Sequence, residues 1–295
     1  MESESVNESR GQGGHEGLVH AVSGRPLEVE KRIVLCADDY GMSAGVSDAV
    51  IQLGRQRVLN ATSAMVLAPR WPEDARRLAE LRGSLDVGLH LDWTSAFAQT
   101  AGHGMALGAA MRRALLGGFD KRAAQGEIER QLDAFEAAWA APPDHIDGHQ
   151  HVQQFAGIRQ ALIEVLARRY GAQSPWLRVS RPAGQRLGLK SKIISALGAN
   201  ALTAASGRAG VPVSQALSGI YGFDAKAGLY ARHMAQWLAE APDGAVLMCH
   251  PSTEAEPGDE IGPARVRELE FLASPAFADQ LQVAGIRLTR GSEVF

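Results

Sequence analysis

From residue 32 onward, short apolar runs rich in β-branched residues alternate with longer segments of helical period. The order strand-then-helix repeats along the chain, which predicts parallel strands joined by right-handed crossovers. The predicted strands are 32–38, 62–68, 85–91, 144–149, 177–182, 245–251 and 284–289, with an eighth near 213–223. The clearest predicted helix carries four large apolar side chains on one face: Ile128, Leu132, Phe135 and Trp139.

Two α/β architectures satisfy this alternation, an open doubly wound sheet and a closed (β/α) barrel. A body of about 260 residues suits the ~250 typical of a (β/α) barrel, and no glycine-rich phosphate-binding loop follows the first strand. We therefore expect a TIM-like (β/α) barrel, either regular or irregular with seven parallel strands, in a single domain over residues 31–295. The glycine- and alanine-rich stretch 99–118 breaks the alternation and is predicted to be a loop insertion with a short helix over one rim.

Composition narrows the choice of partner and compartment. A formal net charge of -3 and a pI near 6.3 provide no basic field for a phosphate backbone, which argues against nucleic acid and favours a small-molecule partner. The two cysteines, Cys36 and Cys249, lie in apolar runs and are expected to be reduced core residues of a cytoplasmic protein. Residues 1–30 are rich in Ser, Glu and Gly without periodicity, which predicts a disordered leader rather than a secretory signal. The sequence does not determine the oligomeric state, and a homo-oligomer is compatible with it.

Polar residues gather where the predicted strands end. The carboxyl ends of parallel strands meet at one mouth of a barrel or one edge of a sheet, so residues distant in sequence are expected to converge. Adjacent Asp38 and Asp39 would repel one another unless a cation or a hydrogen bond intervened. Carboxylate and imidazole groups are good ligands for zinc and related divalent ions. The residues concerned are Asp38, Asp39, His90, Asp147, His149, His151, Arg178, Arg181 and His250.

Each of these residues also has an ordinary structural interpretation. An aspartate at a strand end often caps the next helix, although Ser43 offers an alternative cap. His90 taken alone is more often a hydrogen-bonded core histidine, and His250 before Pro251 is as often a turn residue. The "HIDGHQH" cluster is harder to explain in this way. On an extended strand its histidines and aspartate, two residues apart, share one face and need polar partners if buried.

The ordered set of motifs "ADDYG", "TSAMVLAP", "VGLHLDWT", "HIDGHQHV" and "CHP" resembles the YdjC-like carbohydrate deacetylase family, and in particular its hopanoid-biosynthesis-associated branch. The resemblance runs from about residue 32 to the C-terminus. Three positions depart from the family pattern: Tyr40 stands where phenylalanine is frequent, Gln153 where a further histidine is frequent, and Ser252 where glycine is usual. None of these positions is a proposed ligand.

The resemblance implies a metal-dependent hydrolase that removes the acetyl group from an N-acetylated sugar. Carried over by motif position, it implies Asp38 as general base and Asp39, His90 and His149 as ligands of one divalent ion. Zinc is favoured, and magnesium or another divalent ion is possible. The resemblance implies a second acid–base role for His250, and either His250 or His151 could protonate the leaving sugar nitrogen.

Further residues are predicted to contact the substrate: His151, Arg181 and Tyr40. The branch resemblance implies an N-acetylglucosaminyl hopanoid intermediate, a glycolipid that a cytoplasmic enzyme would meet at the inner membrane surface through segment 99–118. Two other functions fit the same groups of residues. One is a metal-dependent phosphoesterase, which usually needs more bridging carboxylates than the strand ends offer, and the other is a non-catalytic sugar-binding barrel.

Overall fold

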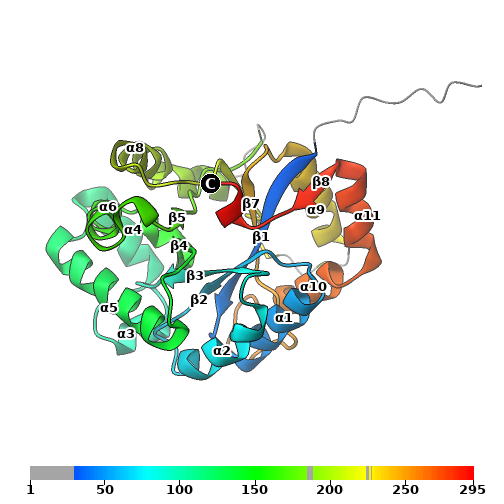
Figure 1. Cartoon of the computed structure of the whole chain (residues 1–295), viewed down its shortest axis with the longest axis horizontal. Helices are drawn as coiled ribbons and strands as arrows, with labels where there is room; N and C mark the ends of the chain where they lie inside the picture. Colours follow the sequence, from blue (N-terminus) through cyan, green and yellow to red (C-terminus); the bar gives the residue numbers. More distant parts are fainter. Residues whose placement is uncertain (1–29, 185–188, 224–225, 227) are drawn as a thin grey trace, which may run out of the picture.

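The computed structural model describes residues 30–184, 189–223, 226 and 228–295 (Figure 1). The predicted leader lies outside the described residues except for Glu30. The strands are β1 (Lys31–Tyr40), β2 (Ala61–Ala64), β3 (Asp86–Leu91), β4 (His145–Gly148), β5 (Trp176–Leu177), β6 (Ala216–Ser218), β7 (Ala245–Cys249) and β8 (Ile286–Leu288). The α-helices are α1 (Ala44–Arg55), α2 (Trp71–Leu78), α3 (Ala96–Thr100), α4 (Leu107–Leu116), α5 (Lys121–Trp139), α6 (Ile158–Arg169), α7 (Leu189–Ala196), α8 (Ala199–Ala209), α9 (Leu229–Glu240), α10 (Gly262–Leu272) and α11 (Pro275–Ala284).

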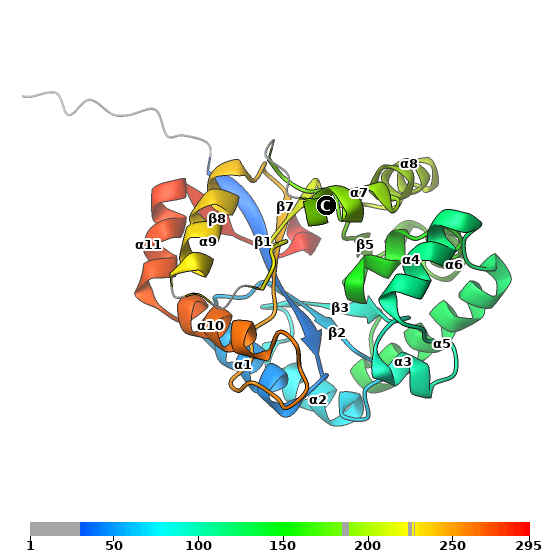
Figure 2. The ribbon, with the colours of Figure 1, turned by 180° about the vertical axis from the view of Figure 1, so that it is seen from behind.

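The strands form one parallel sheet in the order β5-β4-β3-β2-β1-β7-β6, and β8 pairs with the beginning of β1. The two edges of the sheet approach each other through isolated parallel bridges, Leu177 to Val213 and Pro182 to Leu217. Helices cover the outside of the curled sheet (Figures 1 and 2). The fold is therefore an irregular TIM-like barrel of seven parallel strands with an additional short strand, which confirms the predicted class.

The eight strands expected from the sequence are all present, but several are shorter than predicted. Of the predicted 177–182 run only Leu177 lies in a strand, β5, which begins at Trp176, and the strand predicted at 62–68 ends at Ala64. Both runs continue as irregular backbone because their later residues follow turns and loops around the barrel mouth. The eighth strand lies at Ala216–Ser218, inside the predicted 213–223 range.

Alternation along β1 divides its side chains between two cores. Ile33, Leu35 and Ala37 belong to the large core between the sheet and the helices. Val34 and Cys36 belong to a smaller cluster with Trp176 and Met248. Because successive side chains of a strand point to opposite faces, the smaller cluster is the filling of the barrel interior. Both cysteines are buried and free, as expected.

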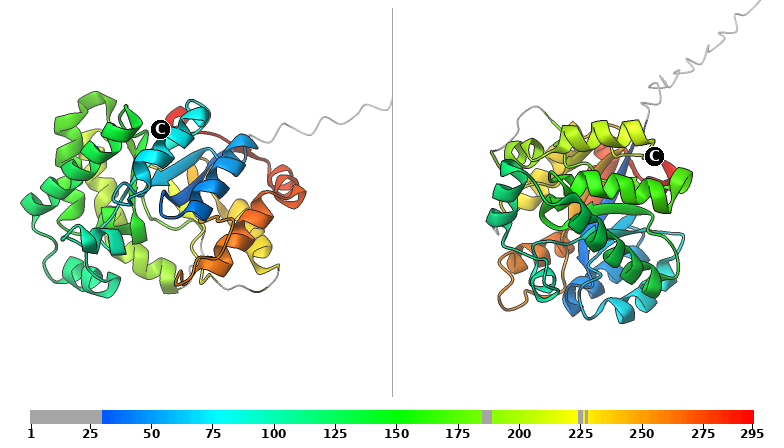
Figure 3. Two further views of the ribbon diagram at one scale, coloured as in Figure 1. Left: turned by 90° about the horizontal axis from the view of Figure 1, so that it is seen from below. Right: turned by 90° about the vertical axis from the view of Figure 1, so that its left-hand side faces the viewer.

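The helices follow sequence signals closely. The Ser43 hydroxyl accepts a hydrogen bond from the Val46 amide and so caps α1, leaving Asp38 and Asp39 free for other partners. The predicted apolar face of α5 is buried from Ile128 to Trp139. Segment 99–118 contains the end of α3 and the whole of α4, so its helical part is longer than the short helix predicted. Figure 3 shows the helices from two further sides. Within the described ranges, no helix is both long and apolar enough to cross a membrane.

Candidate active site

The adjacent side chains of Asp38 and Asp39 both reach the same pocket, although neighbours on a strand normally point to opposite faces. The Asp38 side chain lies on the same inward face of β1 as those of Val34 and Cys36. Asp39 has a left-handed backbone with φ of 68°, and the register between β1 and β2 shifts between Ala37 and Tyr40. A bulge of this kind turns a side chain from one face to another and is common beside active sites. The local distortion therefore explains how two aspartates converge.

Asp39, His90 and His149 bring three ligand atoms together. Oδ1 of Asp39 lies 3.0 Å from Nδ1 of His149 and 3.4 Å from Nε2 of His90. Ligand atoms about 2.0–2.1 Å from a tetrahedral zinc ion lie about 3.3 Å from one another, which matches this spacing. The Asp39 and His90 side chains are 2 % exposed and that of His149 is 18 % exposed. A group of one carboxylate and two imidazoles thus fits a divalent cation that is accessible from the pocket.

Asp147 lies behind His90 and fixes the orientation of its ring. Nδ1 of His90 lies 2.6 Å from Oδ1 of Asp147, so Nδ1 carries the proton and Nε2 faces Asp39. Oδ2 of Asp147 accepts from the Ser63 hydroxyl at 2.5 Å and pairs with Nη2 of Arg178 at 3.1 Å. Such partners of a ligating histidine fix its tautomer and raise its basicity.

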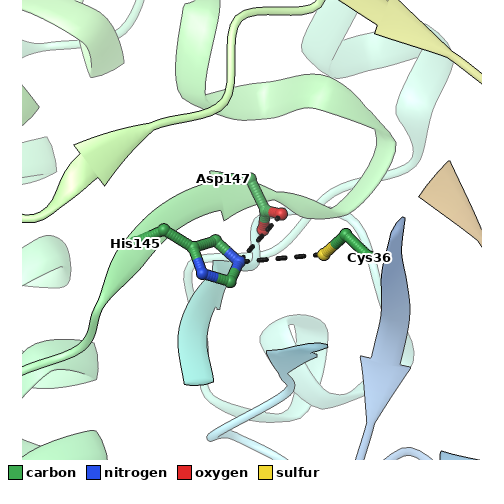
Figure 4. A group of neighbouring side chains, drawn as sticks. All are labelled: Cys36, His145 and Asp147. Carbon is green, nitrogen blue, oxygen red and sulfur yellow. Dashed lines mark hydrogen bonds and ion pairs between the residues drawn. The ribbon is translucent and has the colours of Figure 1, made fainter. Parts of the chain in front are cut away.

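Asp147 also belongs to a second group of side chains, together with Cys36 and His145 (Figure 4). Nε2 of His145 lies 3.8 Å from both the Cys36 sulfur and Oδ2 of Asp147, and 2.9 Å from the Ser63 oxygen. The Ser63 hydroxyl has one proton, which it donates to Asp147, so it must accept from Nε2–H of His145. These side chains are 0 % exposed, and neither Cys36 nor His145 lines the pocket. The group is therefore a hydrogen-bonded support rather than a second accessible metal centre.

Asp38 lies close to His90 and Asp147, with ligand atoms within 4.8 Å of one another, but its carboxylate pairs with an arginine. Arg178 donates to both of its carboxylate oxygens, at 2.6 and 2.7 Å, in a bidentate pair. Nε2 of His250 lies 3.8 Å from Oδ2 of Asp38, and both residues line the pocket. This arrangement holds the Asp38 carboxylate in a fixed orientation near a second group that can exchange protons.

Two residues of α10 complete the site, and the sequence analysis assigned neither a role. Nη2 of Arg265 lies 2.8 Å from Oδ2 of Asp39, which leaves Oδ1 to face the histidines. Glu268 accepts hydrogen bonds from the backbone N–H of His250 at 2.6 Å and from the Tyr221 hydroxyl at 2.6 Å. No local sequence motif marks these two residues, because their roles depend on where α10 packs against the strand ends.

The pKa shifts follow from burial and from these pairs. Burial lowers the pKa of His90, but Asp147 and Asp38 outweigh it and raise that pKa to about 10. A cation at Nε2 would have to displace the proton held there. Burial raises the pKa of Asp39, yet Arg265 and His149 hold it well below its usual value.

The histidines on the pocket wall are shifted in the other direction. Burial and the Arg178 charge lower the pKa of His151 to about 3. Burial, only partly offset by Asp38 and Asp39, lowers the pKa of His250 to about 4. At neutral pH both rings are therefore neutral, and His250 has to accept a proton before it can donate one.

The pocket has a volume of about 800 Å³, and a polar floor meets apolar walls. His151 lines it, with Nδ1 3.0 Å from the Ser180 hydroxyl. Arg181 and Tyr40, also predicted to contact substrate, are not among its lining residues. Arg181 donates to the Gln215 carbonyl, and Tyr40 is buried with its hydroxyl donating to the Asp74 carbonyl. The large apolar residues of the walls are Met42, Leu107, Met111, Leu189, Ile193, Ile194, Leu197, Phe223, Met248 and Ile261.

The expectation that the "HIDGHQH" cluster lies on one face of an extended strand is wrong. β4 ends at Gly148, and residues 149–154 form a 3₁₀ segment in which Gln150 and His151 have left-handed φ values of 54° and 64°. Only His145 and Asp147 share a strand face. The turn after the strand separates the three histidines among the supporting network, the proposed ligand set and the pocket wall.

Comparisons with known proteins identify the family and relatives of this chain. The sequence model of the YdjC-like protein family matches residues 32–283. A chitooligosaccharide deacetylase of Serratia marcescens is 28% identical over 238 residues, 76% of this chain and 83% of that protein. A chitooligosaccharide deacetylase of Yersinia enterocolitica is 27% identical over 277 residues, 88% of this chain and 98% of that protein.

A solved structure supports the fold independently of these sequences. A candidate cellobiose-phosphate cleavage protein of Enterococcus faecalis V583 superposes with a TM-score of 0.65 at 20% identity, over 90% of this chain and 99% of that chain. Fold and site together define an irregular (β/α) barrel with an Asp–His–His group at the carboxyl ends of its strands. The family match covers most of the chain, and the protein belongs to the YdjC-like protein family.

Proposed function

We propose that the protein is a metal-dependent carbohydrate deacetylase, which hydrolyses the N-acetyl group of an N-acetylated sugar. The observation that carries the proposal is the placement of Asp38 beside, but outside, the Asp39–His90–His149 group on the floor of one pocket. The chitooligosaccharide deacetylase names of the two relatives support the same reaction class.

Asp39, His90 and His149 are the residues that would hold the metal. Two imidazoles and one carboxylate favour zinc, whereas magnesium prefers oxygen ligands alone. A divalent ion held by three protein ligands supplies a Lewis acid for the acetyl oxygen and lowers the pKa of a bound water. Arg265 supports this role because it occupies Oδ2 of Asp39 and leaves the other oxygen for the metal.

The chain's own residues supply the proton transfers. Asp38, oriented by Arg178, accepts the proton of the attacking water, a role worth about 10²- to 10⁴-fold in rate. His250 is the group placed to protonate the leaving nitrogen of the sugar. Because its pKa is lowered to about 4, His250 must first take up a proton, and Oδ2 of Asp38 lies 3.8 Å from its Nε2. His151 lines the pocket and would contact the sugar.

For the natural substrate we propose an N-acetylglucosaminyl group carried by a hopanoid lipid. The apolar pocket walls support it, since chitooligosaccharides are polar along their whole length and would leave Leu107, Met111 and Ile193 without apolar contact. Such a glycolipid would reach the enzyme at a membrane surface.

The test is acetate release by the zinc-loaded protein from two N-acetylglucosaminides that share the sugar and differ in the aglycone. One is N,N′-diacetylchitobiose and the other a long-chain alkyl glycoside. We expect release from both and a higher kcat/KM for the alkyl glycoside. Loss of acetate release on chelation and its return with zinc would support metal dependence. No release from either compound would refute the deacetylase proposal, and equal kcat/KM values would refute only the lipid aglycone. A phosphoesterase would instead release phosphate from sugar phosphates. A non-catalytic sugar-binding barrel would bind the sugar without releasing acetate.

A further inference from the structure

Two helices, α4 and α7, border the mouth of the active-site pocket. α4 contributes Leu107 and Met111 to the pocket wall, and α7 contributes Leu189 and Ile193. Both helices lie next to residues 154–157. The Gln154 side chain donates to the Ile194 carbonyl of α7, and Phe119, just after α4, donates its amide to the Ala156 carbonyl. Figure 2 shows α4 and α7 on the same side of the molecule.

α4 and α7 carry most of the large apolar side chains that face solvent in the described part of the chain. Leu115 and Leu116 at the end of α4 are 67% and 86% exposed, and Leu189 and Ile193 on α7 are 75% and 41% exposed. The remaining such residue, Val283, lies on α11. Scattered single exposures need no explanation, but four beside one pocket mouth indicate a surface that another apolar phase covers. We call these four residues the apolar lip.

The two segments that carry the apolar lip are basic, whereas two acidic residues of the pocket, Asp259 and Glu260, come from the segment before α10. Residues 93–119, which include α4, contain no aspartate or glutamate, and neither do residues 165–223, which include α7. Arg112, Arg113 and Lys192 are exposed beside the lip. The chain as a whole carries a net charge of -3, so this basic region is a local departure. Exposed leucines next to arginine and lysine, on segments without an acidic residue, form the pattern of helices that lie in the headgroup layer of an anionic bilayer.

We propose that the apolar lip docks the protein on the surface of an anionic lipid bilayer, with Leu115 and Leu116 entering the headgroup layer and Arg112, Arg113 and Lys192 pairing with lipid phosphates. The pocket mouth, which shares α4 and α7 with the lip, then lies next to the bilayer. Docking does not depend on the reaction that the pocket performs.

Flotation with vesicles tests the proposal on the full chain. Vesicles of phosphatidylcholine alone are compared with vesicles of phosphatidylcholine and phosphatidylglycerol, at low and high salt. We expect binding to the anionic vesicles that falls at high salt, because screening weakens the basic contacts. L115S/L116S removes two exposed side chains that do not line the pocket and should weaken binding about tenfold or more. V283S is the matched control, since it removes an exposed apolar side chain elsewhere and should bind as the wild type does.

Equal binding by L115S/L116S and wild type would overturn the proposal, as would binding to neutral and anionic vesicles alike. Sedimentation without lipid tests the competing occupant. A dimer that L115S/L116S dissociates would assign the apolar lip to a second copy of this chain. Acetate release from water-soluble N,N′-diacetylchitobiose is measured on the same samples and should be unchanged by L115S/L116S. A failure of docking therefore remains distinct from a failure of the deacetylase reaction.

Discussion

Nδ1 of His90 lies 2.6 Å from Oδ1 of Asp147, and this contact leaves the opposite nitrogen of the ring facing Asp39. The orientation of a proposed metal ligand is thus set by a residue that does not line the pocket. Asp147 is in turn fixed by Ser63 and Arg178. The properties of the site depend on this buried chain of hydrogen bonds as much as on the ligands themselves.

Removing the Ser63 hydroxyl should weaken metal binding without removing a ligand. Ser63→Ala removes the nearest donor to Oδ2 of Asp147 and the nearest acceptor of Nε2–H of His145, so Asp147 holds His90 less firmly. We expect zinc affinity to fall by about 10- to 100-fold, as for other partners of metal-binding histidines. Competition with a chromophoric chelator measures the affinity. Ser84→Ala, which deletes a hydroxyl bonded only to the Leu81 carbonyl at a distant turn, is the control and should bind zinc normally.

The adjacent aspartates should separate metal binding from turnover. Asp38→Asn retains shape but cannot take up a proton, so kcat for acetate release should fall by about 10²- to 10⁴-fold while zinc stays bound. Asp39→Asn removes the charge of a proposed ligand, and zinc affinity should fall by at least about 100-fold. Zinc content after dialysis and acetate release are measured on both variants. Asp133→Asn, on the exposed surface of α5, controls for loss of a carboxylate. If Asp38→Asn turned over normally, Asp38 would not be the base.

A buried carboxyl on α10 should make the stability of the protein depend on pH. Burial raises the pKa of Glu268 from 4.5 to about 7, although the His250 amide and the Tyr221 hydroxyl favour the ionised form. The folded state therefore holds this proton more tightly than the unfolded chain. Its contribution to stability is fully present below about pH 4.5 and is lost as pH rises through 7. The shift corresponds to about 3 kcal/mol between the two limits.

Glu268→Gln removes this titration. The wild type should lose about 2.5 kcal/mol of its free energy of unfolding between pH 5 and pH 8 relative to Glu268→Gln, as measured by urea denaturation. Glu270→Gln, at an exposed position on the same helix, should show no such difference. A Glu268→Gln effect that is the same at both pH values would mean that Glu268 is ionised throughout this range in the folded protein.

The sequence was sufficient to predict the fold and most residues of the pocket floor, because both follow from local patterns. Strand-and-helix alternation defines the barrel, and polar groups at strand ends converge at one mouth. Arg265 and Glu268 were not predicted, since their roles depend on where α10 packs rather than on any local motif. Arg181 was preferred over Arg178 as a substrate contact. Only the register of the short β5 determines that Arg178 faces Asp38.

The turns beside the site were the least predictable part. The bulge that brings Asp39 beside Asp38, and the left-handed residues that direct His151 to the pocket wall, carry no glycine to mark them. Tyr40 illustrates the consequence. The same bulge that turns Asp39 inward leaves Tyr40 buried among the core residues between β1 and α2, where its hydroxyl bonds the Asp74 carbonyl.

Close packing against the buried network should make Gly88 on β3 intolerant of any side chain. A Cβ atom there would lie 2.3–2.4 Å from atoms of the His145 ring, which stacks on Trp176 at 4.4 Å and has no space to withdraw. Gly88→Ala should destabilise the protein by about 1–3 kcal/mol, the usual cost of overpacking, and should lower zinc affinity because His145 moves away from Ser63. Gly126→Ala is the matched control: a Cβ at that position of α5 meets nothing within 4 Å, so alanine should stabilise the helix by about 0.5–1 kcal/mol. Urea denaturation measures both variants. Opposite signs for the same added methyl group are expected, and a neutral Gly88→Ala with unchanged zinc affinity would show that His145 does not hold Asp147 in place.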